Sequence, residues 1–493
     1  MITGTITGTT PGESWQRLDR RMLLVHPVNE LVRFLPLVIG VFFLGSSTDG
    51  NEWWHALGIA VPIGLGVLRY LTTSFRIGEQ QLELRRGLLS RNVLTAPLDR
   101  VRTVELTSTP IHRVLGLARV QIGTGSASKS GDERFVLDSL GLEEARRLRV
   151  RLLHRVVEEE AGPDQPDQVL MRLDPGWVRY APLTTGGIVI ALGSLAFLSQ
   201  FADNAIRALA RQGTLRERVH ELPLWGALLS GLVAAVVVVS LLAILGYVLT
   251  NWGFTLSRDP GGHTYHVRRG LLTTRETSIE RERVRGLEIH EPLGLRLAGG
   301  GRLAAIVTGL DRRSRGSAPV VPPAPRRVVV GVGEALLANQ GPFTVRLVPH
   351  GPRARRRRWV RALTVASAVP LLVALGGGFL GWAWWLLAPA LLAWPVAAWL
   401  AHDRYRRLGH ALTPDYLVLQ RDSFRGRRDA LQRVGIIGWN IRQSWFQRRA
   451  GLVTLTATTA AGKQGYHAVD IPEALAVALA DEAVPGLLTP FLG

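Results

Sequence analysis

The chain has 493 residues, a formal net charge of +20 at pH 7 and no cysteine. The absence of cysteine excludes disulfides, thiolate metal sites and cysteine nucleophiles. The length is typical of about three domains, and the arginine-rich composition alone does not indicate phosphate binding.

The first segments to consider are the polar N-terminus and the apolar stretches that follow it. Residues 1–26 lack a cationic region joined to an apolar core, so we expect a polar tail and no signal peptide. Apolar stretches then come in three pairs, at about 35–45 with 53–68, 180–201 with 222–250, and 362–376 with 379–400.

These pairs are compared with the thickness of a bilayer, which needs about 20 largely apolar residues per helix. The second pair is long enough, and the first is short unless flanking residues snorkel. The third is one uncharged run broken by Gly376, Gly377 and Gly378, which indicates a helical hairpin. Six membrane helices in three hairpins are therefore predicted, and buried helices of a large soluble protein are the alternative.

Arginines flank the first and third hairpins on one side only. Arg17, Arg20 and Arg21 precede the first, and the third lies between Arg355–Arg358 and Arg404–Arg407, whereas both hairpin turns are uncharged. The loop between the two helices of the second pair does not fit this pattern, because it carries Arg207, Arg211, Arg216 and Arg218. With two hairpins in agreement, the positive-inside rule predicts a multi-pass inner-membrane protein with both termini and all soluble regions in the cytoplasm.

The sequence RRGLL occurs twice, at 85–89 and 268–272. Val101 lies as far beyond the first copy as Val284 lies beyond the second, so the chain contains an internal repeat. We expect each copy to be a strand end, a turn at Gly87 or Gly270, and two leucines that begin the next strand. Turns are also expected at residues 115–117 and 293–295, which both read Leu-Gly-Leu.

Short alternating stretches follow each expected hairpin, which predicts antiparallel strands. A helix from Leu142 to about Val157 should close the first set, with Asp138 or Ser139 as its cap. In the second set we expect a final strand at 328–332, and in the third a helix beginning after Pro472.

Together, the hairpin, the Gly-Leu-Leu turn, the segment Pro97–Val101 and the segment His112–Ala118 resemble the bacterial PH-like membrane proteins, the family of the domain of unknown function 304 (bPH2, YdbT-like). The resemblance covers nearly the whole chain and is strongest over residues 75–155. It implies three small PH-like units, each a curved antiparallel sheet closed by a C-terminal helix, and it implies no reaction.

The expected fold class is thus an α+β membrane protein in which each of three transmembrane helical hairpins precedes a PH-like antiparallel β domain. The expected segments are a tail at 1–26, hairpins at 27–74, 177–252 and 359–402, PH-like domains at 75–157, 253–341 and 403–485, and linkers at 158–176 and 342–358, with a Pro/Arg-rich insertion at 311–327 inside the second domain.

Motifs for chemistry are few. The pair His263 and His266 has no nearby cysteine and no clear carboxylate partner, so surface histidines are expected there and no metal ligands. Glu158–Glu160 ends a helix, and Gly299–Gly301 lacks the spacing of a phosphate loop. We therefore predict no catalytic residue, no cofactor, no metal and no enzymatic activity.

The strongest charge feature is the arginine run from Arg353 to Arg358 before Trp359. A basic residue near an anionic leaflet gains about 1 kcal/mol, so the run could hold lipid headgroups or could only set the topology. Nucleic acid is not an expected partner, because the arginines are spread along the chain without a recognised module. The candidate headgroup residues are Arg85, Arg86, Arg268, Arg269, Arg355, Arg356, Arg357 and Arg358.

These features favour a platform that presents three PH-like units to protein partners or anionic lipid headgroups, with a role in envelope stress or maintenance. Self-association into a homo-oligomer is a further expectation. The alternative is a transporter or lipid-handling protein that uses the six-helix bundle, although its segments offer mainly serine and threonine as polar groups, which more often serve helix packing.

Overall fold

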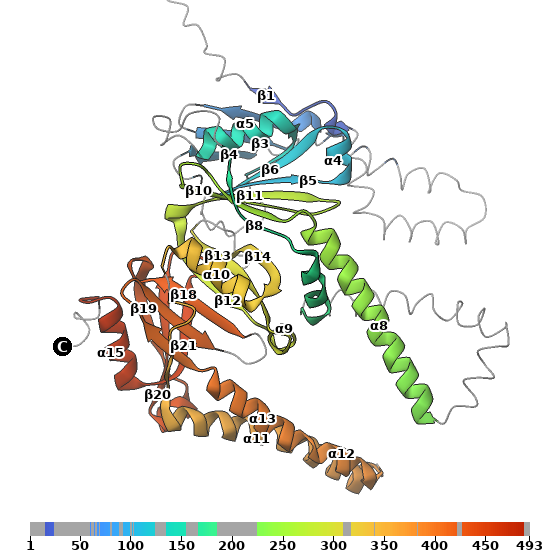
Figure 1. Cartoon of the computed structure of the whole chain (residues 1–493), viewed down its shortest axis with the longest axis vertical. Coiled ribbons are helices and arrows are strands. Elements are labelled where there is room, and N and C mark those ends of the chain that lie inside the picture. The colour runs from blue at the N-terminus through green and yellow to red at the C-terminus, as the bar shows by residue number, and fades with distance from the viewer. Residues whose placement is uncertain are drawn as a thin grey trace, which may run out of the picture. The chain divides into compact units, whose positions relative to one another are not determined.

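The computed structural model describes residues 15–23, 60–123, 135–153, 166–184, 224–308, 317–339, 341–421 and 426–487, with short gaps inside some of these ranges. The chain divides into two compact units. Unit 1 comprises residues 1–172, 252–283 and 309–311, and unit 2 comprises 173–251, 284–308 and 312–493. Both are built on antiparallel sheets (Figure 1).

Unit 1 contains two sheets. The first has the order β1 (Gln16–Arg17), β2 (Ser74–Ile77), β3 (Gln81–Arg86), β4 (Asn92–Pro97). The second has the order β7 (Phe135–Gly141), β6 (Leu117–Gly123), β5 (Thr103–Ser108), β11 (Thr274–Glu280), β10 (Thr264–Arg269), β9 (Thr255–Arg258), β8 (Gln168–Arg172). Its centre is the pairing of β5 with β11, so strands of the first and second repeats form one continuous sheet.

The core of unit 1 follows from the alternation of its strands. Leu82 and Leu84 on β3 point inward two residues apart and are fully buried. Helix α5 (Leu142–Leu153) covers the core with Ala145, Leu148 and Leu152, which the helical period places on one face. A short helix, α4 (Pro110–Val114), connects β5 to β6.

Unit 2 repeats this plan. Its seven-stranded sheet has the order β14 (Ser317–Pro325), β13 (Gly300–Val307), β12 (Val284–His290), β18 (Arg427–Gln432), β17 (Tyr416–Arg421), β16 (Gly409–Leu412), β15 (Val348–Pro349). The pairing of β12 with β18 joins the second repeat to the third. A separate sheet contains β19 (Ile436–Arg442), β20 (Leu452–Thr459) and β21 (Gly465–Pro472).

Three closing helices confirm the expected end of each repeat: α5, α10 (Arg326–Leu337) and α15 (Glu473–Ala483). The helix α15 begins directly after Pro472, as predicted, and buries Ala476, Leu479 and Ala480 in the core of the third repeat. Strand β8 and the 3₁₀ segment η2 (Pro175–Leu183) lie between the first and second repeats, β9 pairs with β10 as β2 pairs with β3, and η3 (Arg281–Arg283) precedes β12.

The repeat is also visible in the backbone at one glycine per copy. Gly116, Gly299 and Gly451 have φ of 68°, 69° and 62° and stand just before β6, β13 and β20. Each ends a short helix, namely α4, α9 (Leu293–Leu297) and α14 (Trp445–Ala450). The predicted turn at 293–295 is therefore wrong: these residues are helical, and the equivalent of Gly116 is Gly299.

The RRGLL prediction is partly confirmed. Strands β3 and β10 end where expected, and Gly87 and Gly270 have φ of 106° and 111°. Leu271 and Leu272 do not begin a strand, because β11 starts at Thr274. A Cβ on Gly270 would collide with the carbonyl oxygen of Thr273, so the turn closes over the two leucines.

Two further details of the second repeat differ from the sequence expectations. Most of the expected insertion at 311–327 is the strand β14, which contains four prolines. Proline cannot donate a ladder hydrogen bond, but β14 is an edge strand, where that donor is not needed. The expected strand at 328–332 lies inside α10 instead.

The expected cap of α5 is also wrong. Strand β7 continues to Gly141 and α5 begins at the next residue, so Asp138 and Ser139 lie in the strand. Asp138 accepts hydrogen bonds from the Nε and Nη2 of Arg119, and Ser139 is buried with a φ of 64°.

The membrane segments are confirmed only in part. Within the described residues, two helical stretches are long and apolar enough to cross a bilayer, Gly351–Leu380 and Trp384–Arg406. The first is α11, and the second contains η5 (Trp384–Leu386), α12 (Leu387–Leu391) and α13 (Ala393–Arg406). Six such helices were expected, but most of the segment 27–74 and all of 185–223 lie outside the described residues.

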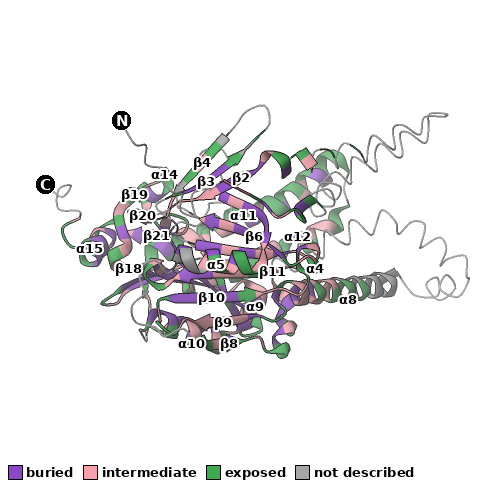
Figure 2. Cartoon of the chain, turned by 90° about the horizontal axis from the view of Figure 1, so that it is seen from above, coloured by how far each residue is buried: buried purple, intermediate pink, exposed green. Residues whose placement is uncertain are grey.

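A third long helix, α8 (Leu224–Asn251), has an apolar part at Val236–Asn251 that is shorter than these two. Its described side chains are mostly exposed or intermediate (Figure 2), including Val236, Leu241 and Leu245. At its C-terminal end the Tyr247 hydroxyl donates to the carbonyl of Pro323 on β14. This helix therefore attaches to the second repeat at one end, and its described part presents apolar side chains.

Candidate functional site at the base of the α11 hairpin

Helix α11 carries the arginine run in its first turns and an apolar surface after it. Pro352 stands in the first turn, where its missing N–H costs nothing, and the run Arg353–Arg358 follows. From Ala362 onward the helix contains no charged residue, and large side chains such as Leu371, Leu372 and Phe379 are exposed.

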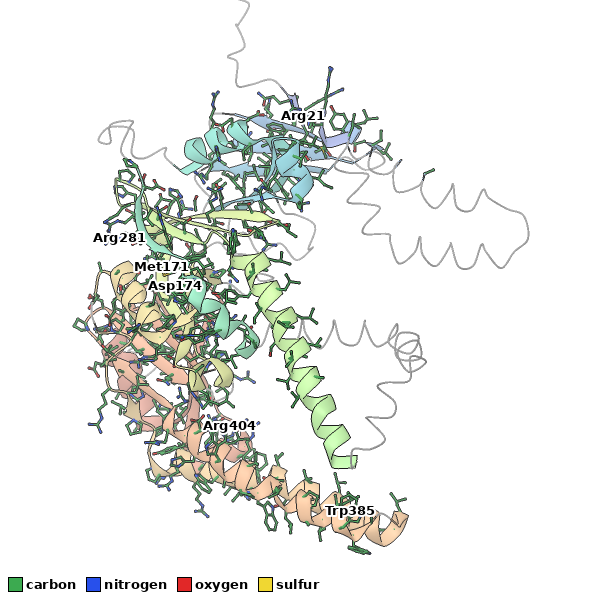
Figure 3. All side chains as sticks on the ribbon, turned by 45° about the vertical axis from the view of Figure 1, so that its right-hand side comes forward. Arg21, Met171, Asp174, Arg281, Trp385 and Arg404 are labelled. Carbon is green, nitrogen blue, oxygen red and sulfur yellow. The ribbon has the colours of Figure 1, made fainter. Side chains whose placement is uncertain are left out.

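The partner of α11 is the stretch that ends in α13, and the two pack through small residues. Ala366 and Gly376 are buried on α11, and Ala397 and Ala401 on α13, while the Trp394 indole donates to the Ser367 hydroxyl at 3.2 Å. Figure 3 shows Trp385 at the tip of this hairpin and Arg404 at its opposite end, beside the sheets of unit 2. The hairpin is thus aromatic at its tip and basic at its base.

The arginine run divides into an exposed part and an internal part. Arg353, Arg355 and Arg356 are exposed, whereas Arg357 and Arg358 are half-buried. The two internal arginines bind one buried carboxylate, Asp470 on β21. Arg358 Nε lies 2.9 Å from Asp470 Oδ2, and Arg357 Nη1 donates to Oδ1.

Asp470 is held in an unusual backbone conformation. Its φ is 58°, next to the irregularity where β20 and β21 change register, and asparagine and aspartate tolerate this region better than most residues. Its Oδ1 also accepts from the Gln447 side chain at 3.0 Å. Asp470 therefore joins three elements, β21, the start of α11 and the helix α14.

The same position is occupied differently in the first repeat. Ser139, with a φ of 64°, stands at the corresponding irregularity between β6 and β7, and its hydroxyl lies 3.4 Å from His112 Nε2. Burial lowers the pKa of His112, although the charge of Asp138 opposes this. The third repeat therefore differs from the first in having a carboxylate at this position, which binds two arginines.

A pair of buried histidines stands beside Asp470. His350 Nε2 and His410 Nδ1 are 3.1 Å apart, and His350 Nδ1 lies 2.9 Å from the carbonyl oxygen of Val469. A carbonyl only accepts, so His350 Nδ1 donates to it, and in a neutral His350 the Nε2 atom accepts from His410. Burial lowers the pKa of both histidines to about 4, with the neighbouring ring adding to the shift of His350.

The base of α13 is attached as well. Asp403 accepts from Arg296 of α9 at 3.0 Å and lies 3.4 Å from Arg407. Arg407 also lies 3.8 Å from Glu291. The hairpin is therefore bound to the second repeat through α13 and to the third repeat through α11.

A second buried ionic cluster lies where β12 pairs with β18. Glu288 and Asp429 face each other across the two strands, and Arg427 donates to both carboxylates. Glu288 also binds His290 and Lys463. Burial raises the pKa of Glu288, but the His290 hydrogen bond and the cations outweigh it, so the pKa falls to about 2.

Asp429 behaves in the opposite way. Burial raises its pKa to about 6 against the charge of Arg427, and its Oδ2 has no hydrogen-bond partner among the described residues. The cluster lies inside the sheet that joins two repeats, and Glu105 opposite Thr277 occupies the same place in unit 1. We interpret it as a structural connection between repeats.

The other predicted headgroup residues have varied surroundings. The guanidinium of Arg85 lies 3.6 Å above the Trp15 ring, and the side chain of Arg86 is outside the described part. Arg268 is exposed and lies 3.4 Å from Glu276. Burial and the charge of Arg275 lower the pKa of Arg269. Arg85, Arg268 and Arg269 belong to unit 1, whereas the arginines of α11 belong to unit 2.

His263 lies just before β10, and His266 lies within it. His263 is exposed, and His266 lies near Asp167 and Asp259, with ligand atoms within 4.8 Å of one another. The sequence did not reveal Asp167, because it is distant in the chain, whereas Asp259 lies close to both histidines in the sequence and was overlooked. His266 Nδ1 bonds to Ser278 and Asp167 accepts from Ser257, so the hydrogen bonds of the sheet account for this group.

Sequence reasoning missed Asp470, Gln447 and the histidine pair. One signal was present: Ser444 followed three residues later by Gln447 is a capping box, and the structure forms it at the start of α14. Nothing in the local sequence marked Asp470, because its role depends on α11, which is more than a hundred residues away in the chain.

The comparisons with known proteins agree with this architecture. A model of the bacterial PH domain matches three times, at residues 31–156, 194–328 and 360–482. The chain is 19% identical over 199 residues to the UPF0699 transmembrane protein YdbT of Bacillus subtilis (strain 168), a match that covers 36% of this chain and only 40% of that protein. No solved structure matches. With three matches that together cover most of its length, the chain belongs to the bacterial PH domain family.

Proposed function

We propose that this chain is a multi-pass membrane protein that presents its PH-like repeats at the cytoplasmic face and binds anionic lipid headgroups there. The observation that carries this proposal is the base of α11, where Arg353, Arg355 and Arg356 are exposed immediately before an apolar helix. The proposed role is binding, without catalysis.

The dimensions of the hairpin support a bilayer crossing. From Ala362 to Leu380 is about 19 residues, or roughly 28 Å at 1.5 Å per residue, close to the thickness of a bilayer core of about 30 Å. The large apolar side chains along it are exposed, and exposed apolar surface of this extent is rare in soluble proteins. The YdbT relative is itself named a transmembrane protein.

Orientation and the other crossings rest on the sequence. Both ends of the α11 hairpin carry arginines, which favours the cytoplasmic side for the repeats. We propose that the apolar segments before the first and second repeats form two more hairpins, which gives six crossings with every repeat on one side.

Within this proposal the headgroup site is smaller than the predicted arginine run. Arg357 and Arg358 belong to the Asp470 network and hold the helix in place, so of the predicted run Arg355 and Arg356 remain, joined by Arg353. Basic side chains near an anionic leaflet gain about 1 kcal/mol each, so three of them contribute about 3 kcal/mol.

The test uses the full chain in detergent micelles, with phosphatidylglycerol or phosphatidylcholine added as the ligand. We expect phosphatidylglycerol to raise the melting temperature and phosphatidylcholine not to. The variant Arg355→Gln/Arg356→Gln should weaken phosphatidylglycerol binding by about 2 kcal/mol, or roughly 30-fold.

The control is Arg147→Gln/Arg172→Gln, which removes two exposed arginines from α5 and β8 of unit 1. It should bind like the unaltered chain. If both variants lose binding equally, attraction is only a matter of net charge, and if neither loses any, the base of α11 is not the site and protein partners become the better explanation.

A further inference from the structure

Helix α14 presents an aromatic pair to solvent. Trp445 is 57% exposed and Phe446 is 68% exposed, and their rings meet edge to face at 4.9 Å. The guanidinium of Arg449 lies 4.1 Å above the Trp445 ring, and Arg448 beside it is exposed. Two large exposed aromatic side chains on one short helix are costly in water, so a partner surface is expected.

The position of this pair is fixed by the Asp470 network. Gln447, the buried residue of α14, caps the helix through Ser444 and donates its amide to Thr454 and to Asp470. Asp470 also binds Arg357 and Arg358. The helix that carries the aromatic pair is therefore held beside the basic turns of α11.

That level is close to the start of the apolar surface. Arg358 precedes Ala362 by about 6 Å along the helix axis at 1.5 Å per residue. If α11 crosses a bilayer, its basic turns lie among the headgroups, and α14 lies at the same depth. Tryptophan beside arginine is a frequent combination at this depth, since the ring is amphipathic and arginine binds phosphate.

The pair is also specific to the third repeat. The corresponding helices α4 and α9 have the sequences PIHRV and LGLRL, without an aromatic residue other than histidine. A fold requirement for Trp445 and Phe446 would apply to all three positions.

We propose that Trp445 and Phe446 insert into the interfacial zone of the leaflet that α11 enters, with Arg448 and Arg449 on the anionic phosphates. This inference rests on the proposed membrane crossing of α11 and adds a second, separate attachment of the third repeat to the lipid surface. It fixes the orientation of that repeat against the membrane.

The absence of cysteine makes a direct test possible, since one introduced thiol is unique. Phe446→Cys carries a nitroxide label, and the full chain is reconstituted in vesicles of phosphatidylcholine alone or with phosphatidylglycerol. Collision rates with oxygen, which concentrates in lipid, and with a water-soluble nickel complex report the depth. The control Val434→Cys lies on η6 (Arg433–Gly435) at the other end of β19 and is 84% exposed.

We expect the nickel complex to collide several-fold less often at position 446 than at position 434, with oxygen collisions higher at 446. Immersion that increases with phosphatidylglycerol would assign part of the attachment to the arginines. Equal nickel collisions at the two positions would overturn the inference, and so would shielding from both reagents, which indicates contact with protein.

A third label at Leu372→Cys separates this inference from the proposed function. Leu372 is 62% exposed in the middle of α11 and should be accessible only to oxygen. A label in water at 446 with lipid at 372 refutes the aromatic attachment alone, whereas water at both positions refutes the membrane crossing itself.

Discussion

Replacement of Asp470 by asparagine tests the network that joins α11, α14 and β21. Asparagine retains the shape and tolerates the φ of 58°, so the change removes only the charge. Loss of one partner from a buried ion pair costs about 3 to 5 kcal/mol, because the other partner is left uncompensated. Arg357 and Arg358 keep 20% and 18% of their side chains exposed, so water can solvate them in part and the lower end, about 3 kcal/mol, is expected.

The assay is thermal unfolding of the full chain in detergent, combined with hydrogen exchange. A loss of about 3 kcal/mol should lower the melting temperature of a unit of this size by roughly 6 to 12 °C, at 2 to 4 °C per kcal/mol. Exchange should increase in α14 and in the first turns of α11 before it increases in α15.

The matched control is Asp481→Asn, which removes one exposed carboxylate from α15 and should change stability by less than about 0.5 kcal/mol. If Asp470→Asn melts at the same temperature as the control and α14 exchanges no faster, Asp470 does not hold the base of the hairpin. It then does not fix the position of the aromatic pair either.

Three other predictions follow from the same structure. Because the pKa of His350 and of His410 is lowered to about 4, the unfolded chain binds more protons than the folded chain between pH 4 and 6.5. The free energy of unfolding should therefore fall as the pH is lowered through that range, by at most about 3 kcal/mol per histidine. His350→Gln should flatten the pH dependence of the melting temperature, and curves parallel to those of the unaltered chain would contradict this. Glu288→Gln should cost about 3 kcal/mol in denaturant unfolding, the lower end for a broken buried pair, because Arg427 and Lys463 lose a shared carboxylate while Asp429 still binds Arg427; a loss under 1 kcal/mol would show that the cluster is not a connection between repeats. Gly270→Ala should lower the melting temperature more than Gly262→Ala, since both have positive φ but only the first places a methyl group against the Thr273 carbonyl, and equal losses would refute this steric argument.

Much of the fold could be predicted because the signals are local. Strand alternation, the glycine turns at Gly87 and Gly270 and the helix after Pro472 all lie within a few residues of their cause. Even the wrong equivalence at 293–295 came from a local resemblance between two Leu-Gly-Leu triplets, one of which is helical. The spacing is the same in both repeats from Gly87 or Gly270 to the valine that follows it, Val101 or Val284. If this spacing is continued, the equivalent of Gly116 is Gly299.

The pairing between repeats could not be predicted, because it depends on which strand edges meet. Each repeat was expected to form its own sheet, yet β5 pairs with β11 and β12 with β18. For the same reason the sequence revealed the arginine run but not which of its arginines are exposed and which are internal. Arg357 and Arg358 become internal only because β21 places Asp470 beside them.

The measurement that tests the central claim most directly is the topology of the α11 hairpin in cells. In the cysteine-free chain, Ala383→Cys places one thiol in the exposed turn at the tip, and Asp481→Cys places one on α15. A membrane-impermeant maleimide should label position 383 in intact cells and position 481 only after the membrane is opened. Labelling of both positions in intact cells, or of neither until the membrane is opened, would contradict a hairpin that crosses the membrane and holds the repeats on its cytoplasmic side.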